Sequence, residues 1–350
     1  MKKDGIIKNR CEFMALVQAK MCNPNGDPDR DNAVRQDPVT GIGFITDVSV
    51  KRWIRNYVRD AYCDVADMEI MMQNGTSINR RIAEAVMDAN GFANGEIPKD
   101  ALGKDKKFVN KKVKESGEQM ALRFWDVRAF GGVLSTGLNA GQLRGAVQIE
   151  MPTSVDPIEP ETITITRMAY ADGKDFQTLK EYEREEAERP DDKKRTMGNK
   201  SFIPYGLYIM TGTVSAAFAE RTGFTEEDLN ILWEAILQML DHNVSSSKTG
   251  MSVVSPVIIF KHVGTQHDNN ETQKEKEAKL GCAPAHKLFG LLDVHKKDGV
   301  EAPRSLNDYE ITFNYSKLPK GVELGLKFYP YEEPVWGRKA FEEWDEASVV

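Results

Sequence analysis

Four cations recur along one stretch of the chain at helical spacing. Lys51, Arg55 and Arg59 are four residues apart. Arg52 lies beside the first of them. Side chains four residues apart share one side of an α-helix, so a helix here would present a cationic face. Such a face indicates either contact with nucleic-acid phosphates, whose counterions it displaces, or an ordinary solvated surface. The nearby Arg35 favours the phosphate contact.

Carboxylates alternate in the segment just before this stretch. Asp27, Asp29 and Asp31 resemble the start of a calcium-binding loop. That loop requires a glycine where this chain has Asn32 and a bidentate glutamate where it has Pro38, so calcium is excluded. Alternating acids beside a basic helix can still hold Mg²⁺ or assist RNA cleavage. A solvated turn is the preferred interpretation.

The sequence contains no complete motif for the other common reaction centres. The chain has no GxxxxGK[ST] phosphate loop and no GxGxxG turn, and Ser135 lacks the first glycine of a GxSxG nucleophile elbow. Cys282 and His286 have a chelating spacing, but a structural zinc site needs four ligands, usually with a close cysteine pair. We therefore predict no metal centre and no cofactor. The glycine-rich stretch 130–145 permits close approach of a phosphate chain, or forms an ordinary loop.

The elements that position these residues follow from local patterns. Residues 11–21 form an apolar run of strand length, and 23–32 are dense in turn formers. Thr46 can cap a helix that begins at Asp47. Apolar residues then recur at three and four, giving that helix one buried face: Val50, Ile54, Tyr57, Val58 and Ala61.

The remaining chain alternates between strands and helices. Thr225 opens a second helix with acids in its first turn. Residues 62–125 are expected to be an inserted, lysine-rich helical region, and 264–280 a charged connection. Strands are expected at 143–151, 162–167, 203–217, 255–263, 287–294, 309–315 and 322–329. The order matches β-α-β-β-α-β, the α+β pattern of ferredoxin-like and RNA-recognition folds.

The composition bounds the function classes. The 350 residues carry 47 basic and 54 acidic side chains, a formal net charge of −7, which is a mild argument against nucleic acid. Basic residues concentrate in 104–128 and acids in the tail, so the charge layout is dipolar. Four scattered cysteines without a CxxC indicate a reducing compartment. With no apolar run of membrane-spanning length, we predict a cytoplasmic protein without membrane contact.

Several sequence blocks occur in the same order as in a known protein family. They resemble the "Cas seven" backbone subunit of the CRISPR-associated Cascade complex, subtype I-C, within the RAMP superfamily. The blocks are Asn23-Pro24-Asn25-Gly26-Asp27-Pro28 with Thr46-Asp47-Val48 and Lys51-Arg52; Asp126-Val127-Arg128 with Phe130-Gly131; Gly141-Gln142-Leu143-Arg144-Gly145; and Met197-Gly198-Asn199-Lys200 with Ile203-Pro204-Tyr205-Gly206.

This resemblance implies an architecture. The family has a modified RRM-like palm with inserted helical fingers and a thumb hairpin. By this resemblance, the palm comprises 1–61 with the first strand and basic helix, 126–161 and 203–330. The fingers are 62–125, the thumb 162–202, and an acidic tail follows over 331–350.

The resemblance also implies roles for individual residues. Lys51, Arg52 and Arg55 would contact RNA phosphates, with Ser49 nearby. The loop residues Phe130, Gly131 and Gly132 would line the same channel, together with Gln142 and Arg144. Met197 would be the wedge that the thumb pushes into the RNA. The aromatic signature of a true RRM is absent, so RNA is not expected to stack across the sheet.

Partners follow from the same resemblance. The chain would bind a CRISPR RNA (crRNA) along a head-to-tail filament of its own copies, and reach target DNA through the guide. It would also contact the 5′-handle-binding, large and small subunits of Cascade.

Two functions are weighed against each other. The first is a non-catalytic RNA-binding scaffold, which reads charge and shape because guide sequences vary. The second is a metal-dependent endoribonuclease of the kind found in type III backbone subunits, with Asp27 as its acid. We favour the scaffold, because type I complexes recruit a separate nuclease.

Overall fold

One long apolar strand forms the centre of the molecule. The computed structural model describes residues 4–91, 106–171, 173–265, 271–328 and 333–340. Strand β1 (Cys11–Cys22) is buried along most of its length because both faces of the sheet are covered. It pairs antiparallel with β10 (Thr196–Val214), from Cys11 opposite Val214 to Cys22 opposite Ile203. The expected strand at 11–21 is thus confirmed as the spine of the fold.

The main sheet extends to both sides of this pair. Its strand order is β16-β15-β12-β1-β10-β8-β4, with β7, β9 and β11 attached to β10 or β1. All of its pairings are antiparallel. The strands besides β1 and β10 are β4 (Ile42–Phe44), β7 (Val147–Ile149), β8 (Thr153–Pro157), β9 (Glu161–Arg167), β11 (Met251–Val253), β12 (Val257–His262), β15 (Val322–Lys327) and β16 (Val335–Trp336).

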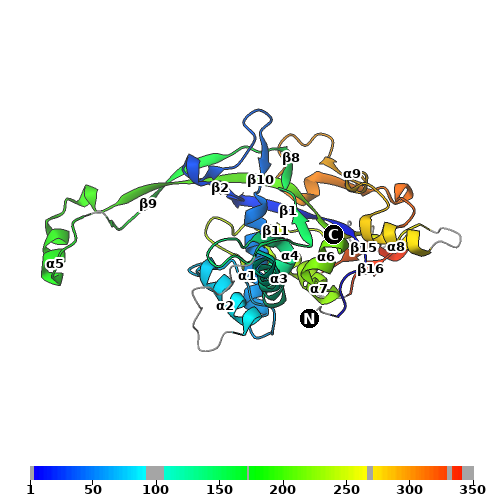
Figure 1. Ribbon diagram of the computed structural model, residues 1–350. Helices are drawn as coiled ribbons and strands as arrows, with labels where there is room; N and C mark the ends of the chain where they lie inside the picture. The colour runs from blue at the N-terminus through cyan, green and yellow to red at the C-terminus, as the bar shows by residue number, and fades with distance from the viewer. Residues whose placement is uncertain (1–3, 92–105, 172, 266–270, 329–332, 341–350) are drawn as a thin grey trace.

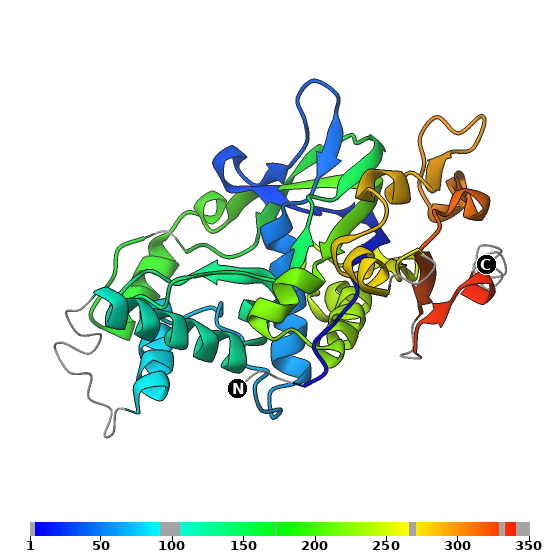
Figure 2. The ribbon, with the colours of Figure 1, turned by 45° about the vertical axis from the view of Figure 1, so that its right-hand side comes forward.

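Helices cover one face of this sheet and a smaller layer covers the other. Figures 1 and 2 show α1 (Asp47–Ala61), α6 (Ala216–Thr222) and α7 (Glu226–His242) on the same side. Their apolar faces pack on alternate residues of β1, including Phe13 and Val17. On the opposite face, Met14 and Leu16 pack beneath α9 (Ala285–Phe289) and the hairpin β13 (Leu292–Lys296) and β14 (Tyr309–Phe313). The period-two alternation of β1 divides the two cores.

Both predicted helix starts are confirmed. The Thr46 side chain accepts a hydrogen bond from the Ser49 amide at the start of α1. Thr225 and Asp228 form a reciprocal capping box at the start of α7. The Asp228 carboxylate also pairs with Arg128, 2.8 Å away, and both side chains are fully buried. The capping residue Asp228 therefore also holds the distant segment that contains Arg128.

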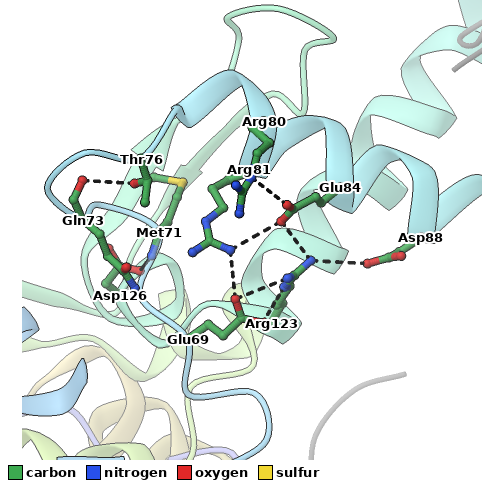
Figure 3. A network of polar contacts seen from close by, with 10 residues as sticks. All are labelled: Glu69, Met71, Gln73, Thr76, Arg80, Arg81, Glu84, Asp88, Arg123 and Asp126. Carbon is green, nitrogen blue, oxygen red and sulfur yellow. Dashed lines mark hydrogen bonds and ion pairs between the residues drawn. The ribbon is translucent and has the colours of Figure 1, made fainter. Parts of the chain in front are cut away.

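A helical subdomain with its own small core lies beside this layer. It contains α2 (Ile78–Asn90), α3 (Lys106–Arg123) and α4 (Trp125–Phe130). Ile82, Val86 and Phe124 belong to its buried cluster. At its surface, Arg123 pairs with Glu69, Glu84 and Asp88, as Figure 3 shows.

A long arm projects from the sheet. It consists of β9, the first part of β10 and the helix α5 (Leu179–Glu188) at its far end (Figure 1). The pairing runs from Glu161 opposite Phe202 to Arg167 opposite Thr196. Strand β10 therefore passes from the arm into the core without interruption, so the arm is joined to the sheet by a continuous strand.

Several sequence expectations need correction. Residues 271–280 of the expected charged connection form helix α8 (Glu271–Leu280). The strand expected at 287–294 begins instead within helix α9, and β13 starts only at Leu292, because the short apolar run there fits either element. The strand expected at 203–217 ends at Val214, where Ser215 caps α6. Lys99, Lys104 and residues 341–350 of the expected tail lie outside the described residues.

The fold class is an α+β arrangement around an antiparallel sheet, as predicted. Among the elements of the central sheet and its helical layer, β1, α1, β8, β10, α7 and β12 occur in this chain order, with other elements inserted between them. Within the described residues, no helix combines the length and the apolar character needed to cross a membrane. Further short strands are β2 (Gly26–Asp27), paired with β3 (Ala33–Val34), and β5 (Gly131–Val133), paired with β6 (Gln142–Arg144).

Candidate nucleic-acid interface

The amino end of α1 is held in place by the loop after β1. Asn25 accepts hydrogen bonds from both the backbone amide and the hydroxyl of Thr46. The Thr46 hydroxyl in turn contacts that of Ser49, at 3.0 Å. A helix amino terminus carries partial positive charge and favours anions. Ser49 therefore lies in the first turn of a rigidly anchored helix, one turn from the cations that follow.

Two of these cations flank one aromatic ring. The Lys51 ammonium lies 5.9 Å and the Arg55 guanidinium 5.0 Å from the centre of the Phe130 ring. A ring face attracts cations and orders their long side chains. The structure thus brings together three of the residues singled out in the sequence, from two elements: α1 and the end of α4.

Both cations also have acidic partners. Lys51 pairs with Asp47 at 2.8 Å, one turn earlier on the same helix. Arg55 pairs at 2.8 Å with Asp126, whose side chain is 1% exposed. Asp126 also accepts hydrogen bonds from the amides of Met71 and Met72 (Figure 3 labels Met71 and Asp126). Arg55 therefore joins α1 to α4, whereas Lys51 pairs with a partly buried carboxylate of its own helix, and that pair links no second element.

Two glycines allow the chain after Phe130 to pack closely against the segment 143–145. Gly131 has φ +74°, and a Cβ there would lie 2.3 Å from the Leu143 carbonyl oxygen. Gly145, across the hairpin, would meet the Ala129 carbonyl oxygen at the same distance. In β5 and β6, Gly131 stands opposite Arg144, and Gly132 opposite Leu143. The hairpin thereby places Gln142 and Arg144 beside the end of α4.

Three polar side chains of this region are exposed: Arg52, Gln142 and Arg144. Neither arginine has an ion-pair partner among the described residues. Arg144 lies over the ring of Phe218 on α6, at 5.3 Å, and Arg221 lies 5.6 Å from the same ring. Sequence reasoning missed Phe218 and Arg221. It assigned 203–217 to a strand, so no helical face was considered there.

Comparison with known proteins identifies the family of this chain. The sequence model of the family described as CRISPR-associated protein Cas7 matches residues 9–314, which is most of the chain. This chain belongs to the Cas7 family. A curated relative from Haloferax volcanii, CRISPR-associated protein Cas7, is 28% identical over 281 residues, covering 74% of this chain and 72% of the relative.

Two solved structures were also found to be similar to this Cas7 chain. One, titled "CRISPR RNA-guided surveillance complex, pre-nicking", is 17% identical, with a TM-score of 0.43 and coverage of 80% of this chain and 85% of that one. The other, titled "CRISPR RNA-guided surveillance complex", is 16% identical, with a TM-score of 0.36 and coverage of 80% and 79%.

In this Cas7 protein, Arg35 and Asp27 lie on the loop before α1 and contact each other. Arg35 pairs with Asp27 at 3.2 Å and donates to the Gly26 carbonyl. The Asp27 carboxylate also accepts from the Asp29 amide, at the start of a short 3₁₀ turn. Within the described residues, no three histidine, cysteine or acidic side chains converge as a metal site. Asp27 is thus engaged within its own loop.

Met197 is set apart from the other candidate residues. It lies on the arm, 73% exposed, opposite Thr166 of β9. Directly opposed residues of an antiparallel pair share one side of the ribbon. One side of the arm therefore carries Met197 with threonines of β9, and the other carries Ile163 and Ile165, which are 45% and 48% exposed. The arm thus has two chemically different faces.

Proposed function

We propose that this Cas7 protein is the non-catalytic, guide-RNA-binding backbone subunit of a type I-C surveillance complex in the cytoplasm. One observation carries the proposal. The Lys51 and Arg55 cations of α1 lie over Phe130 at the end of α4, next to the β5–β6 hairpin, and Arg52 of α1 and Arg144 of the hairpin have no acidic partners in the described chain.

The division of labour among these residues follows from their contacts. Arg52, Arg144 and Lys51 contact phosphates, with Ser49 contributing a hydroxyl at the helix amino terminus. Arg55 holds Phe130 and α4 in register with α1. Gly131 lets β6 approach β5 closely. Gly131, Gly132 and Gln142 border the channel. Arg35 shapes the neighbouring loop through Asp27.

The remaining architecture fits this role. The chain order β1, α1, β8, β10, α7 and β12 supports a ferredoxin-like palm. The subdomain of α2 and α3 would be the fingers, and the arm the thumb, with Met197 as its wedge. Copies would join head to tail along the guide, since a contact whose rotation does not close produces a filament. Target DNA and the other Cascade subunits would then be reached through the assembled filament.

The test is RNA binding by the purified full-length chain. We expect gel filtration with absorbance at 260 and 280 nm to show a large, RNA-containing species that RNase shrinks. Lys51→Ala combined with Arg52→Ala should weaken binding to all guide sequences equally and reduce the salt slope by ~0.7 per lost contact. A loss confined to particular sequences would contradict phosphate recognition.

The non-catalytic part of the proposal has its own test. The Asp27 carboxylate already accepts from Arg35 and from the Asp29 amide, which suits a structural role. We expect no Mg²⁺-dependent cleavage of guide-paired RNA by the wild-type assembly. Cleavage that Asp27→Ala abolishes, with RNA binding retained, would show that the protein is an endoribonuclease.

A further inference from the structure

A groove lies between the hairpin, α3 and α6. It has a volume of about 820 Å³. Its walls come from α3, α6 and β6, and include Asn110, Gly117, Gln142, Arg221 and Thr222. Ligand sites are typically concave and of ~300–1,000 Å³. The groove is therefore large enough for a nucleotide unit.

Most charges that line the groove are already neutralised. Arg128 at its floor is held by Asp228. Lys114 lies 3.8 Å from Glu118, and Glu220 accepts from Lys279 outside the groove. Arg221 is the lining residue that adds uncompensated charge within the described chain. The groove thus favours an anion.

Two arginines are positioned to bind phosphate beside the groove: Arg221 lines it, and Arg144 directly follows the lining residues Gln142 and Leu143. The guanidinium groups of Arg144 and Arg221 both lie over the Phe218 ring, at 5.3 and 5.6 Å from its centre. Neither has an acidic partner among the described residues. A guanidinium that stacks on a ring keeps its planar edge of N–H donors free for a phosphate. The partly buried Phe218 ring orders both side chains without neutralising them.

A second observation comes from inside the groove. Thr222 lines it and is 4% exposed, and its hydroxyl has no hydrogen-bond partner among the described residues. A buried hydroxyl without a partner is unfavourable, so such groups normally find one. A ribose or base inserted into the groove would supply that partner.

We propose that this groove binds one nucleotide of the guide RNA, with its phosphate held by Arg144 and Arg221 and its sugar or base beside Thr222. The inference rests on the proposed function. It extends the RNA path from α1 across the β5–β6 hairpin to α6, because Arg144 belongs to both surfaces.

The experiment measures RNA binding by the full chain across a series of salt concentrations. The probe is a fluorescein-labelled, unstructured RNA oligonucleotide, followed by anisotropy. We expect Arg221→Ala to weaken binding several-fold and to reduce the salt slope by ~0.7, the value for one phosphate of a single strand. Phe218→Leu should weaken binding without changing the slope, because it removes the platform and not a charge.

Lys320→Ala provides the matched control. It removes an exposed cation from a loop beside β15, away from the groove, and should leave the slope unchanged. A slope for Arg221→Ala equal to that of Lys320→Ala overturns the inference while the proposed function stands. A wild-type chain that binds no RNA overturns both.

A crosslinking measurement locates the contact independently. RNA containing 4-thiouridine is irradiated with the wild-type protein, and the adducts are mapped by mass spectrometry. We expect adducts within 216–223 as well as near Phe130. Adducts near Phe130 alone would contradict the inference. It would also be contradicted if Arg221→Ala and Phe218→Leu bound RNA normally and lost only the binding of complementary DNA.

Discussion

Arg52 and Arg55 are cations on the same helix with different surroundings. Arg55 is mostly buried and pairs with a buried carboxylate that also accepts from two backbone amides. Arg52 is exposed and has no acidic partner in the described chain. The first arginine is therefore expected to act on stability, and the second on RNA binding.

This contrast gives a prediction at the residue scale. Arg55→Gln should lower the free energy of unfolding by about 2–4 kcal/mol, near the lower part of the range for breaking a buried pair, because Arg55 retains some contact with water. Arg52→Gln should change it by less than ~0.5 kcal/mol. Urea denaturation measures both. Equal effects of the two substitutions would contradict the assignment of Arg55 as a joint between α1 and α4.

The cysteines provide a second prediction at this scale. Burial raises the pKa of Cys11 to about 12 and that of Cys22 to about 11, whereas Cys63 is exposed. Thiols react as thiolates, so Cys11 and Cys22 should resist a chromogenic disulfide reagent at neutral pH until the protein unfolds. Cys63→Ser combined with Cys282→Ser, which removes the two cysteines that are not fully buried, should remove the fast phase of labelling. A fast phase that persists would show that the core opens readily.

The same thiols make stability depend on pH. Their pKa values are raised in the folded state, so the folded protein keeps protons that the unfolded chain releases above the ordinary thiol value of 9.0. Their contribution is thus intact below pH 9 and is lost as pH rises from there toward 11 and 12. Replacing Cys22 by Ala should flatten this alkaline decline.

At the scale of elements, the β5–β6 hairpin depends on one close approach. Gly131 has φ +74°, and its α-carbon faces the backbone of Leu143 and Gly145. Gly75 has the same φ, but nothing lies within 4 Å of a Cβ built there. A side chain at Gly75 would therefore cause conformational strain alone, whereas a side chain at Gly131 would cause the same strain and a steric collision as well.

Alanine substitutions should distinguish these two effects. Gly75→Ala should cost only the left-handed strain, roughly 1–2 kcal/mol. Gly131→Ala should cost more and should also weaken RNA binding, because it forces β5 away from β6 and displaces Arg144. Denaturation and RNA anisotropy measure the two consequences. If both variants lost the same free energy of unfolding, the collision at Gly131 would be absent. If Gly131→Ala bound RNA normally, the hairpin geometry would not be needed for the interface.

At the scale of the whole molecule, the arm bears exposed apolar side chains without a partner in the described chain. Ile163 and Ile165 lie on the side opposite Met197. In the proposed filament, we expect this face to pack on the next copy and the Met197 face to meet the RNA. Burying such residues between copies would stabilise the assembly through the hydrophobic effect.

The corresponding prediction concerns assembly. Ile163→Ser with Ile165→Ser should leave the stability of the monomer nearly unchanged, since both residues are exposed. It should reduce the mass of the RNA-bound species measured by light scattering. Thr162→Ser with Thr164→Ser, on the Met197 side of the same strand, serves as the control. Assemblies of wild-type mass in the isoleucine variant would exclude this face from the contact.

Local chemistry was readable from the sequence alone. The apolar run of β1, the Thr46 cap and the Thr225 capping box act over a few residues, and each predicted element formed where expected. The order of strands and helices predicted an α+β fold for the same reason. Where the expectations failed, at α8 and at the start of α9, charged or apolar runs without clear periodicity left the choice of element to the surrounding structure.

The tertiary structure alone decided which cations are available to bind. Helical spacing made Lys51, Arg52 and Arg55 look equivalent, but Arg55 meets Asp126, a residue 71 positions away. Arg128, counted in the basic region, is buried against Asp228, 100 positions away. The fold also placed Phe218 and Arg221 beside Arg144. Charge pairing depends on distances of a few ångströms between segments far apart in the chain, and no local pattern encodes those distances.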